Sequence, residues 1–167
     1  VQDKLRQREC FEGLPQPDFA ALPAWPGAAD GAGATGGAVG EAGWRQAVCE
    51  LAEARFGWPV VQKTRHGGYD GRGVAVLRGP QDVLQESGRL LLADSYLESF
   101  VPLSMELAVI TARGAAGQAV FPVAEMRFDP DANICTSVAF PARCSAAVSA
   151  EAVRIAREAA DRLDVHG

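Results

Sequence analysis

PVVQKTRHGGYDGRGVAVL, residues 59–77, combines two short β-branched runs with a glycine-rich segment between them. The runs at residues 59–63 and 73–77 have the composition of strands, and glycine readily adopts the positive φ angles of a turn. A Walker A loop or a dinucleotide fingerprint would need a helix after the glycines, and the spacing of neither motif is present. The stretch therefore predicts a β-hairpin with a long tip.

The tip of this hairpin, residues 64–73, is suited to binding phosphate. Its four glycines can bring successive backbone N–H groups close to an anion, and Arg72 adds a guanidinium. Lys63, at the end of the first strand, would hold an ammonium group near the loop. From composition alone, a flexible hairpin tip and a solvated strand-end lysine remain alternatives.

Working outward from the hairpin, the sequence predicts three helices. The first spans residues 3–12, with Asp3 as N-cap and Gly13 at its exit. Apolar residues at three- and four-residue spacing predict a second helix over residues 43–56, and a third over residues 149–163 with Ser149 as N-cap.

Further strands are expected at residues 18–22, 90–101, 105–113, 118–128 and 133–140. Turn formers separate the later strands, so the middle of the chain is expected to be mostly an antiparallel meander, and the predicted fold class is α+β. Residues 79–88 are expected to be a linker. Residues 23–43, rich in glycine and alanine, are expected to be a flexible insertion because they offer little apolar surface to offset ordering entropy.

The composition argues against several classes of function. A formal net charge of −5 is unsuited to broad binding of nucleic acid or anionic lipid. The four cysteines are widely spaced and only two histidines accompany them, so we expect reduced thiols and no zinc site. No apolar run has membrane length, and no secretory leader is evident. A cytoplasmic location is the resulting expectation.

A second candidate site is the hinge SFVPLSM, residues 99–105, between Glu98 and Glu106. Unpaired backbone at such a hinge can offer a carbonyl and an N–H to an adenine edge, and a nearby carboxylate can accept from ribose hydroxyls. Solvated glutamates beside a turn are the alternative interpretation.

The run VQKTRHGGYDGRG closely resembles the signature loop of the N5-carboxyaminoimidazole ribonucleotide synthetases, a family of ATP-grasp ligases. The order of other landmarks agrees: an opening QDKL helix, the E-x-F-V hinge followed by P-x-x-x-E-L, and a proline-initiated strand with Glu125. The resemblance spans nearly the whole chain outside the glycine and alanine insertion. It implies an ATP-grasp fold with antiparallel sheet subdomains and packed helices.

Residue by residue, the resemblance puts Lys4 and Lys63 at two ATP-phosphate positions and Glu106 at the ribose. The implied phosphate lid comprises Gly68, Tyr69, Asp70, Gly71, Arg72 and Gly73. The implied adenine hinge comprises Glu98, Ser99, Phe100 and Val101. Three positions depart from the family pattern: Val74 replaces a glutamine, and Met126 and Phe128 replace an asparagine and a histidine that contacts ATP in some members.

The resemblance implies an enzyme that uses ATP, with Mg²⁺, to carboxylate 5-aminoimidazole ribonucleotide with bicarbonate in purine biosynthesis, as a homodimer. The family's ribonucleotide-binding domain would precede residue 1, and its metal-binding carboxylate would follow residue 167. Residues 1–167 are therefore expected to be a partial ATP-grasp domain without ligase activity of its own and without metal ligands.

Two alternatives remain open. Another ATP-grasp ligase, such as a biotin carboxylase or a formate-dependent glycinamide ribonucleotide ligase, would lack the Tyr69-Asp70 pair in its glycine run. A degenerate domain acting as a non-catalytic regulatory module would fit the departures at Val74, Met126 and Phe128.

Overall fold

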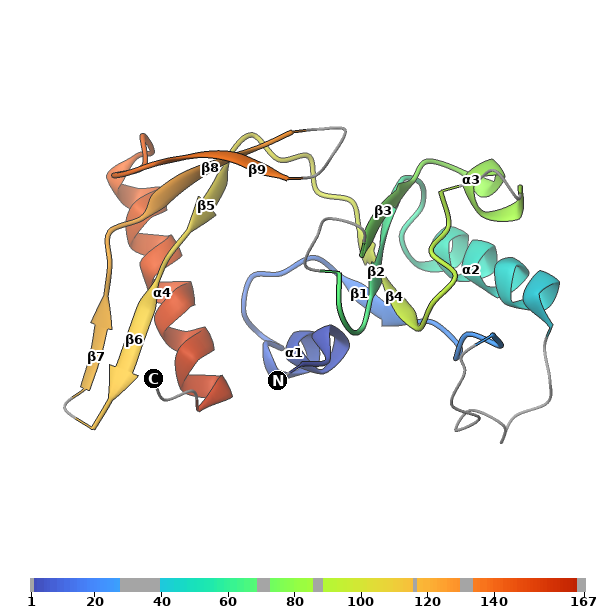
Figure 1. Cartoon of the computed structure of the whole chain (residues 1–167), viewed down its shortest axis with the longest axis horizontal. Coiled ribbons are helices and arrows are strands. Elements are labelled where there is room, and N and C mark those ends of the chain that lie inside the picture. Colours follow the sequence, from blue (N-terminus) through green and yellow to red (C-terminus); the bar gives the residue numbers. More distant parts are fainter. Residues whose placement is uncertain are drawn as a thin grey trace. The chain divides into compact units, whose positions relative to one another are not determined.

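The computed structural model describes residues 2–27, 40–68, 73–85, 89–115, 117–129 and 134–164. The chain divides into two compact units (Figure 1). The first unit comprises Val1–Arg8 and Pro17–Val101, and the second comprises Glu9–Gln16 and Pro102–Gly167. Helix α1, Lys4–Cys10, contributes residues to both units.

The first unit is built on a four-stranded antiparallel sheet with the order β1-β4-β2-β3. Its strands are β1 (Phe19–Ala21), β2 (Val60–Thr64), β3 (Val74–Leu77) and β4 (Ser95–Ser99). Strands β2 and β3 pair directly, so the predicted hairpin is confirmed. Strand β4 lies between β1 and β2, and the sheet is therefore not a simple meander.

Helices α2 (Glu41–Arg55) and α3 (Pro80–Leu84) lie together beside this sheet (Figure 1). They cover one of its faces with a hydrophobic core. The fully buried side chains of this core include Trp44, Val48, Val60, Leu77, Val83 and Leu97. Side chains alternate between the two faces of a strand, so the neighbours of Leu97 on β4, Tyr96 and Glu98, point to the opposite face.

The second unit contains a three-stranded antiparallel sheet, β5-β8-β9, and a β6-β7 hairpin. The strands are β5 (Glu106–Ala108), β6 (Thr111–Gly114), β7 (Gly117–Val120), β8 (Ala124–Phe128) and β9 (Cys135–Ala139). Helix α4 (Ala146–Leu163) runs alongside these strands (Figure 1). Helices that pack on antiparallel sheets in each unit confirm the α+β class.

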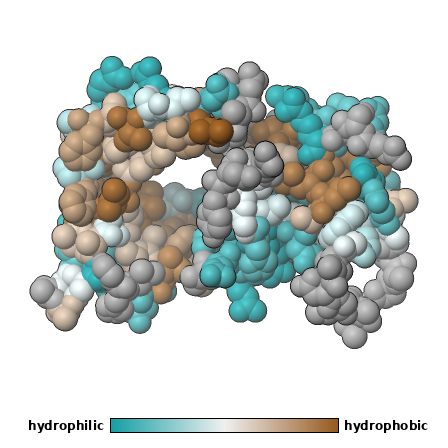
Figure 2. Space-filling view, in the orientation of Figure 1, coloured by the Kyte–Doolittle hydropathy of each residue, from teal (hydrophilic) through white to brown (hydrophobic). Residues whose placement is uncertain are grey.

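Large apolar side chains remain at the surface of the second unit. Figure 2 shows hydrophobic residues gathered over its strands, and Ile110, Phe121, Val138 and Phe140 are each more than half exposed. Helix α4 has no buried residue. The main hydrophobic core among the described residues therefore lies in the first unit.

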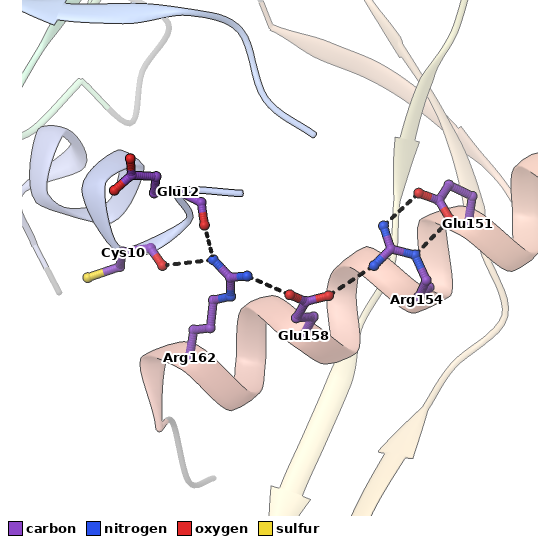
Figure 3. Close-up of polar contacts among 6 residues, drawn as sticks. All are labelled: Cys10, Glu12, Glu151, Arg154, Glu158 and Arg162. Atoms are coloured by element: carbon purple, nitrogen blue, oxygen red, sulfur yellow. Dashed lines mark hydrogen bonds and ion pairs between the residues drawn. The ribbon is translucent and has the colours of Figure 1, made fainter. Parts of the chain in front are cut away.

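Polar contacts along α4 reach the last residue of α1 and the turn that follows it, both within the second unit (Figure 3). Arg154 pairs with Glu151 at 2.7 Å and with Glu158 at 2.9 Å, and Arg162 pairs with Glu158 at 2.6 Å. Arg162 also donates to the backbone carbonyls of Cys10 and Glu12. Arg162 thus supplies a donor to carbonyl groups at the end of a short helix, where intrahelical partners are lacking.

Several predicted boundaries were wrong. The expected linker at residues 79–88 contains α3, whose Pro80 suits a first helical turn and whose Asp82 side chain accepts from the Arg78 N–H at 2.7 Å. The expected strand at residues 90–101 is reduced to β4. The strands expected at residues 105–113 and 118–128 each divide in two, because β5 and β8 pair with one another while β6 pairs with β7.

Residues at both ends of the predicted insertion, 23–43, take part in the described structure. Trp44 donates its indole N–H to the Pro23 carbonyl at 2.8 Å, and its ring meets that of Trp25 edge-on with centroids 4.9 Å apart. Helix α2 begins at Glu41, two residues before the predicted start. The predicted flexibility of residues 28–39 lies outside the described residues.

The N-cap predicted for the last helix was also wrong. The Ser145 hydroxyl accepts from the Val148 N–H at 3.2 Å, while the Ser149 N–H donates to the Ser145 carbonyl at 3.0 Å. Ser145 is therefore the N-cap, and Ser149 lies inside the first turn.

Replacing Ser145 and Ser149 separately by alanine tests this assignment. We expect Ser145→Ala to lower the free energy of unfolding by about 1 kcal/mol, because it removes the acceptor of an N-terminal N–H group. Ser149→Ala should leave stability unchanged or slightly raised, because alanine has the higher helix propensity. Urea unfolding followed by circular dichroism measures both, and a larger loss at Ser149 would contradict the assignment.

Candidate functional site

A nearly buried carboxylate on the sheet face opposite the hydrophobic core organises the candidate site. The Glu98 side chain on β4 is only 3% exposed, yet each of its oxygens meets a cation. Lys63 Nζ on β2 lies 2.7 Å from Oε2, and Arg8 Nε on α1 lies 2.6 Å from Oε1. Both cations remain partly exposed and together exceed the carboxylate by one positive charge. The cluster can therefore attract an anion while holding its cations in fixed directions.

Tyr96 belongs to the same cluster as Glu98. It precedes Glu98 by two residues on β4, faces the same side of the sheet and is 1% exposed. Burial, and then the negative charge of Glu98, raises the pKa of Tyr96 to about 12. The phenol is protonated at neutral pH, as an ordinary tyrosine is, and can act as a hydrogen-bond donor beside the carboxylate.

The glycine-rich loop has a tightly closed base. A Cβ atom added to Gly68 would lie 2.7 Å from the Gly73 Cα, and one added to Gly73 would lie 2.7 Å from the Thr64 Oγ1. Gly67 and Gly68 also have φ angles of +68° and +75°. These contacts explain why glycine is needed at both ends of the loop. Thr64 Oγ1 is buried at this base without a hydrogen-bond partner among the residues described.

Lys4 approaches the same loop from α1. Its backbone N–H donates to the Arg65 carbonyl at 2.9 Å, and its Nζ donates to the Gly67 carbonyl at 2.5 Å. The structure thus places Lys4 at the loop and Lys63 beside Glu98. These cations, the closed glycine base and the orphaned Thr64 hydroxyl fit a phosphate group.

The predicted hinge divides at the end of β4. Glu98 and Ser99 belong to the strand, whereas Phe100 and Val101 follow it and are 43% and 44% exposed. Glu106 begins β5 in the second unit. The adenine and ribose roles of these residues stay predictions. The lid residues Tyr69, Asp70, Gly71 and Arg72 lie outside the described residues, and so do their predicted contacts.

Glu125 on β8 forms a separate cluster in the second unit. Its side chain is 8% exposed and pairs with Arg143 at 3.3 Å and with Arg127 at 3.4 Å. Hydrogen bonds from Arg143 are the largest influence holding the pKa of Glu125 below its usual value. The departures noted at Met126 and Phe128 lie on the same strand.

The sequence interpretation missed Arg8, Tyr96, Arg143 and Arg127. Signals for the first two were present: Arg8 follows Lys4 by four residues and shares a helix face with it, and Tyr96 alternates with Glu98 on a strand. Arg143 lies 18 residues beyond Glu125, and no local spacing joins them. Within the described part of the chain, no group of three or more His, Cys, Asp or Glu side chains could hold a metal ion.

The model of the ATP-grasp domain matches residues 43–167, about three quarters of the chain. The N5-carboxyaminoimidazole ribonucleotide synthase of Synechococcus elongatus is 35% identical over 171 residues, covering 99% of this chain and 37% of that protein. The chain therefore spans under two fifths of the length of this curated relative.

Solved structures agree with the sequence match. The ADP complex of an N5-carboxyaminoimidazole ribonucleotide synthetase has a TM-score of 0.75 and 29% identity, covering 99% of this chain and 38% of that one. The N5-carboxyaminoimidazole ribonucleotide synthetase of Thermotoga maritima has a TM-score of 0.68 and 28% identity, covering 98% and 35%. Because the family model matches about three quarters of the chain and these relatives agree with it, the chain belongs to the ATP-grasp family.

Proposed function

We propose that this chain is the ATP-binding part of a carbon-nitrogen ligase that carboxylates 5-aminoimidazole ribonucleotide with bicarbonate and ATP. The observation that carries the proposal is the cluster of Lys63, Arg8 and Glu98 beside the closed glycine base. The signature loop predicts a phosphate site at this position. The named relatives are synthases of the carboxylated ribonucleotide.

The chemistry needs charge neutralisation more than a protein nucleophile. A bicarbonate oxygen attacks the γ-phosphorus of ATP, and ADP leaves, giving carboxyphosphate. The amino nitrogen of the ribonucleotide then forms a bond to the carboxyl carbon, and phosphate leaves. Fixed cations and backbone N–H groups lower the barrier of the first step by stabilising negative charge on the transferred group.

Each predicted site residue has a role in this proposal. Lys63 and Lys4 contact phosphate oxygens, and Glu98 orients Lys63. The backbone of residues 98–101 reads the adenine edge, and Glu106 accepts from the ribose. Residues 68–73 close over the phosphates as a lid.

Other parts of the proposal extend from the family resemblance alone. Mg²⁺ would supply positive charge to neutralise the phosphates of ATP. Among the described residues, no group of three or more His, Cys, Asp or Glu side chains could hold it. We also propose a homodimer that acts in the cytoplasm. No helix in the described segments is long and apolar enough to cross a membrane.

Lys63→Ala tests the phosphate role. We expect the Kd for ATP to rise about tenfold to a hundredfold, because a charge-assisted contact to phosphate is lost. Arg55→Ala is the matched control, since it removes one exposed positive charge from the end of α2. Calorimetric titration of ATP into the 167-residue chain measures both. Equal affinities for Lys63→Ala and the unmodified chain would contradict the role, provided that circular dichroism shows both folded.

The ligase activity can be tested in a chimera. The corresponding segment of the Synechococcus elongatus relative is replaced by this chain, and phosphate release is measured with ATP, bicarbonate and 5-aminoimidazole ribonucleotide. We expect release that requires all three substrates and that falls at least about tenfold, at subsaturating ATP, in the Lys63→Ala chimera. The 167-residue chain alone should release no phosphate. A folded chimera that binds ATP but does not turn over would favour the regulatory module.

A further inference from the structure

Asp3 joins the start of α1 to the base of the glycine-rich loop. The Arg65 guanidinium forms a bidentate ion pair with the Asp3 carboxylate. Nε lies 3.3 Å from Oδ1 and 3.1 Å from Oδ2, and Nη2 also donates to Oδ2. The Asp3 side chain is only 11% exposed. This two-pronged pair lies just before the loop, because Arg65 directly follows the last residue of β2.

Lys4 is fixed by the same arrangement. Asp3 Oδ1 accepts from the N–H of Leu5 at 3.0 Å and caps α1, so the direction of the helix is set at Asp3. The next residue, Lys4, donates its N–H to the Arg65 carbonyl and its ammonium to the Gly67 carbonyl. Asp3, which caps α1, and Lys4, the first residue of α1, thus hold the chain at Arg65 and at Gly67.

The charge on Asp3 is more than a helix cap requires. Asparagine caps helices about as well as aspartate, so capping alone does not explain an ionised carboxylate at this position. Hydrogen bonds from Arg65 are the main influence that keeps the pKa of Asp3 below its usual value. The nearby His66 is 63% exposed, with Nε2 3.8 Å from the carboxylate, and is a weaker partner. The ion pair with Arg65 therefore explains why residue 3 is an aspartate and not an asparagine.

We propose that Asp3 and Arg65 are positioning residues for the ATP phosphates, acting through Lys4. The proposal rests on the proposed ATP-binding function. Lys63 is carried by β2, whereas Lys4 is carried by a separate helix. The Asp3–Arg65 pair fixes that helix against the end of β2. Both ammonium groups are therefore already in position when ATP binds, and no ordering of α1 is needed.

The test is a set of ATP titrations by calorimetry at a temperature where every variant is folded. We expect Asp3→Asn, which keeps the helix cap, and Arg65→Gln to raise the Kd for ATP by similar factors of about tenfold. The Asp3→Asn/Arg65→Gln double variant should bind as each single variant does, because either change already breaks the pair. Lys4→Ala with Asp3→Asn should bind no more weakly than Lys4→Ala alone.

His66→Gln is the matched control, because it removes a second side chain near the Asp3 carboxylate and leaves Arg65 intact. It should change the Kd less than about twofold. An unchanged Kd for Asp3→Asn would overturn the proposal, and so would losses that add in either double variant. Weaker binding in Arg65→Gln but not in Asp3→Asn would show that Arg65 contacts ATP directly, which also overturns it.

The unmodified chain and Lys63→Ala separate this inference from the function on which it rests. If the unmodified chain does not bind ATP, or Lys63→Ala binds it equally well, the proposed function fails and this inference fails with it. If the unmodified chain binds ATP and Lys63→Ala weakens binding, unchanged affinity in Asp3→Asn removes the positioning role alone.

Discussion

The first unit depends on the Glu98 carboxylate, which lies almost out of solvent between two cations. A charge in such a position is costly unless it is paired and hydrogen-bonded. Lys63 and Arg8 meet this requirement from β2 and α1, and Glu98 itself belongs to β4. One electrostatic constraint therefore determines how two strands and a helix meet, and it does so on the face where the candidate site lies.

The same sheet carries two different kinds of packing. Leu97 and Val60 point into the apolar core under α2, while Tyr96 and Glu98 point to the charged face. Strand β4 is buried on both faces, so its position is defined by hydrophobic contact on one side and by ion pairs on the other. A site built on such a strand keeps its geometry because the core beneath it is closely packed.

Local chemistry predicted the parts of the structure that depend on neighbouring residues. The glycine run predicted the hairpin, and Lys63, expected as the last residue of the first strand, lies one residue before its end at Thr64. Ser145 and Ser149 show the limit, because both can cap a helix and only the hydrogen bond to Val148 distinguishes them. Arg8 was missed because its partner lies 90 residues away, and pairing at such a separation is set by the order of strands in the sheet. The separate pairing of β5 with β8 and of β6 with β7 was also missed, because it too depends on how the strands are arranged in the fold.

Because Gly68 and Gly73 lie close together, the register of the β2-β3 hairpin does not depend on the length of the loop between them. A Cβ atom added to Gly68 would lie 2.7 Å from the Gly73 Cα, and the Thr64 N–H donates to the Gly73 carbonyl at 3.0 Å. The two ends of the loop are therefore already close together at its base. The entropy of closing a loop rises only slowly with its length. The number of residues between these two glycines can therefore change at little entropic cost, while β2 and β3 keep the register in which Lys63 pairs with Val74.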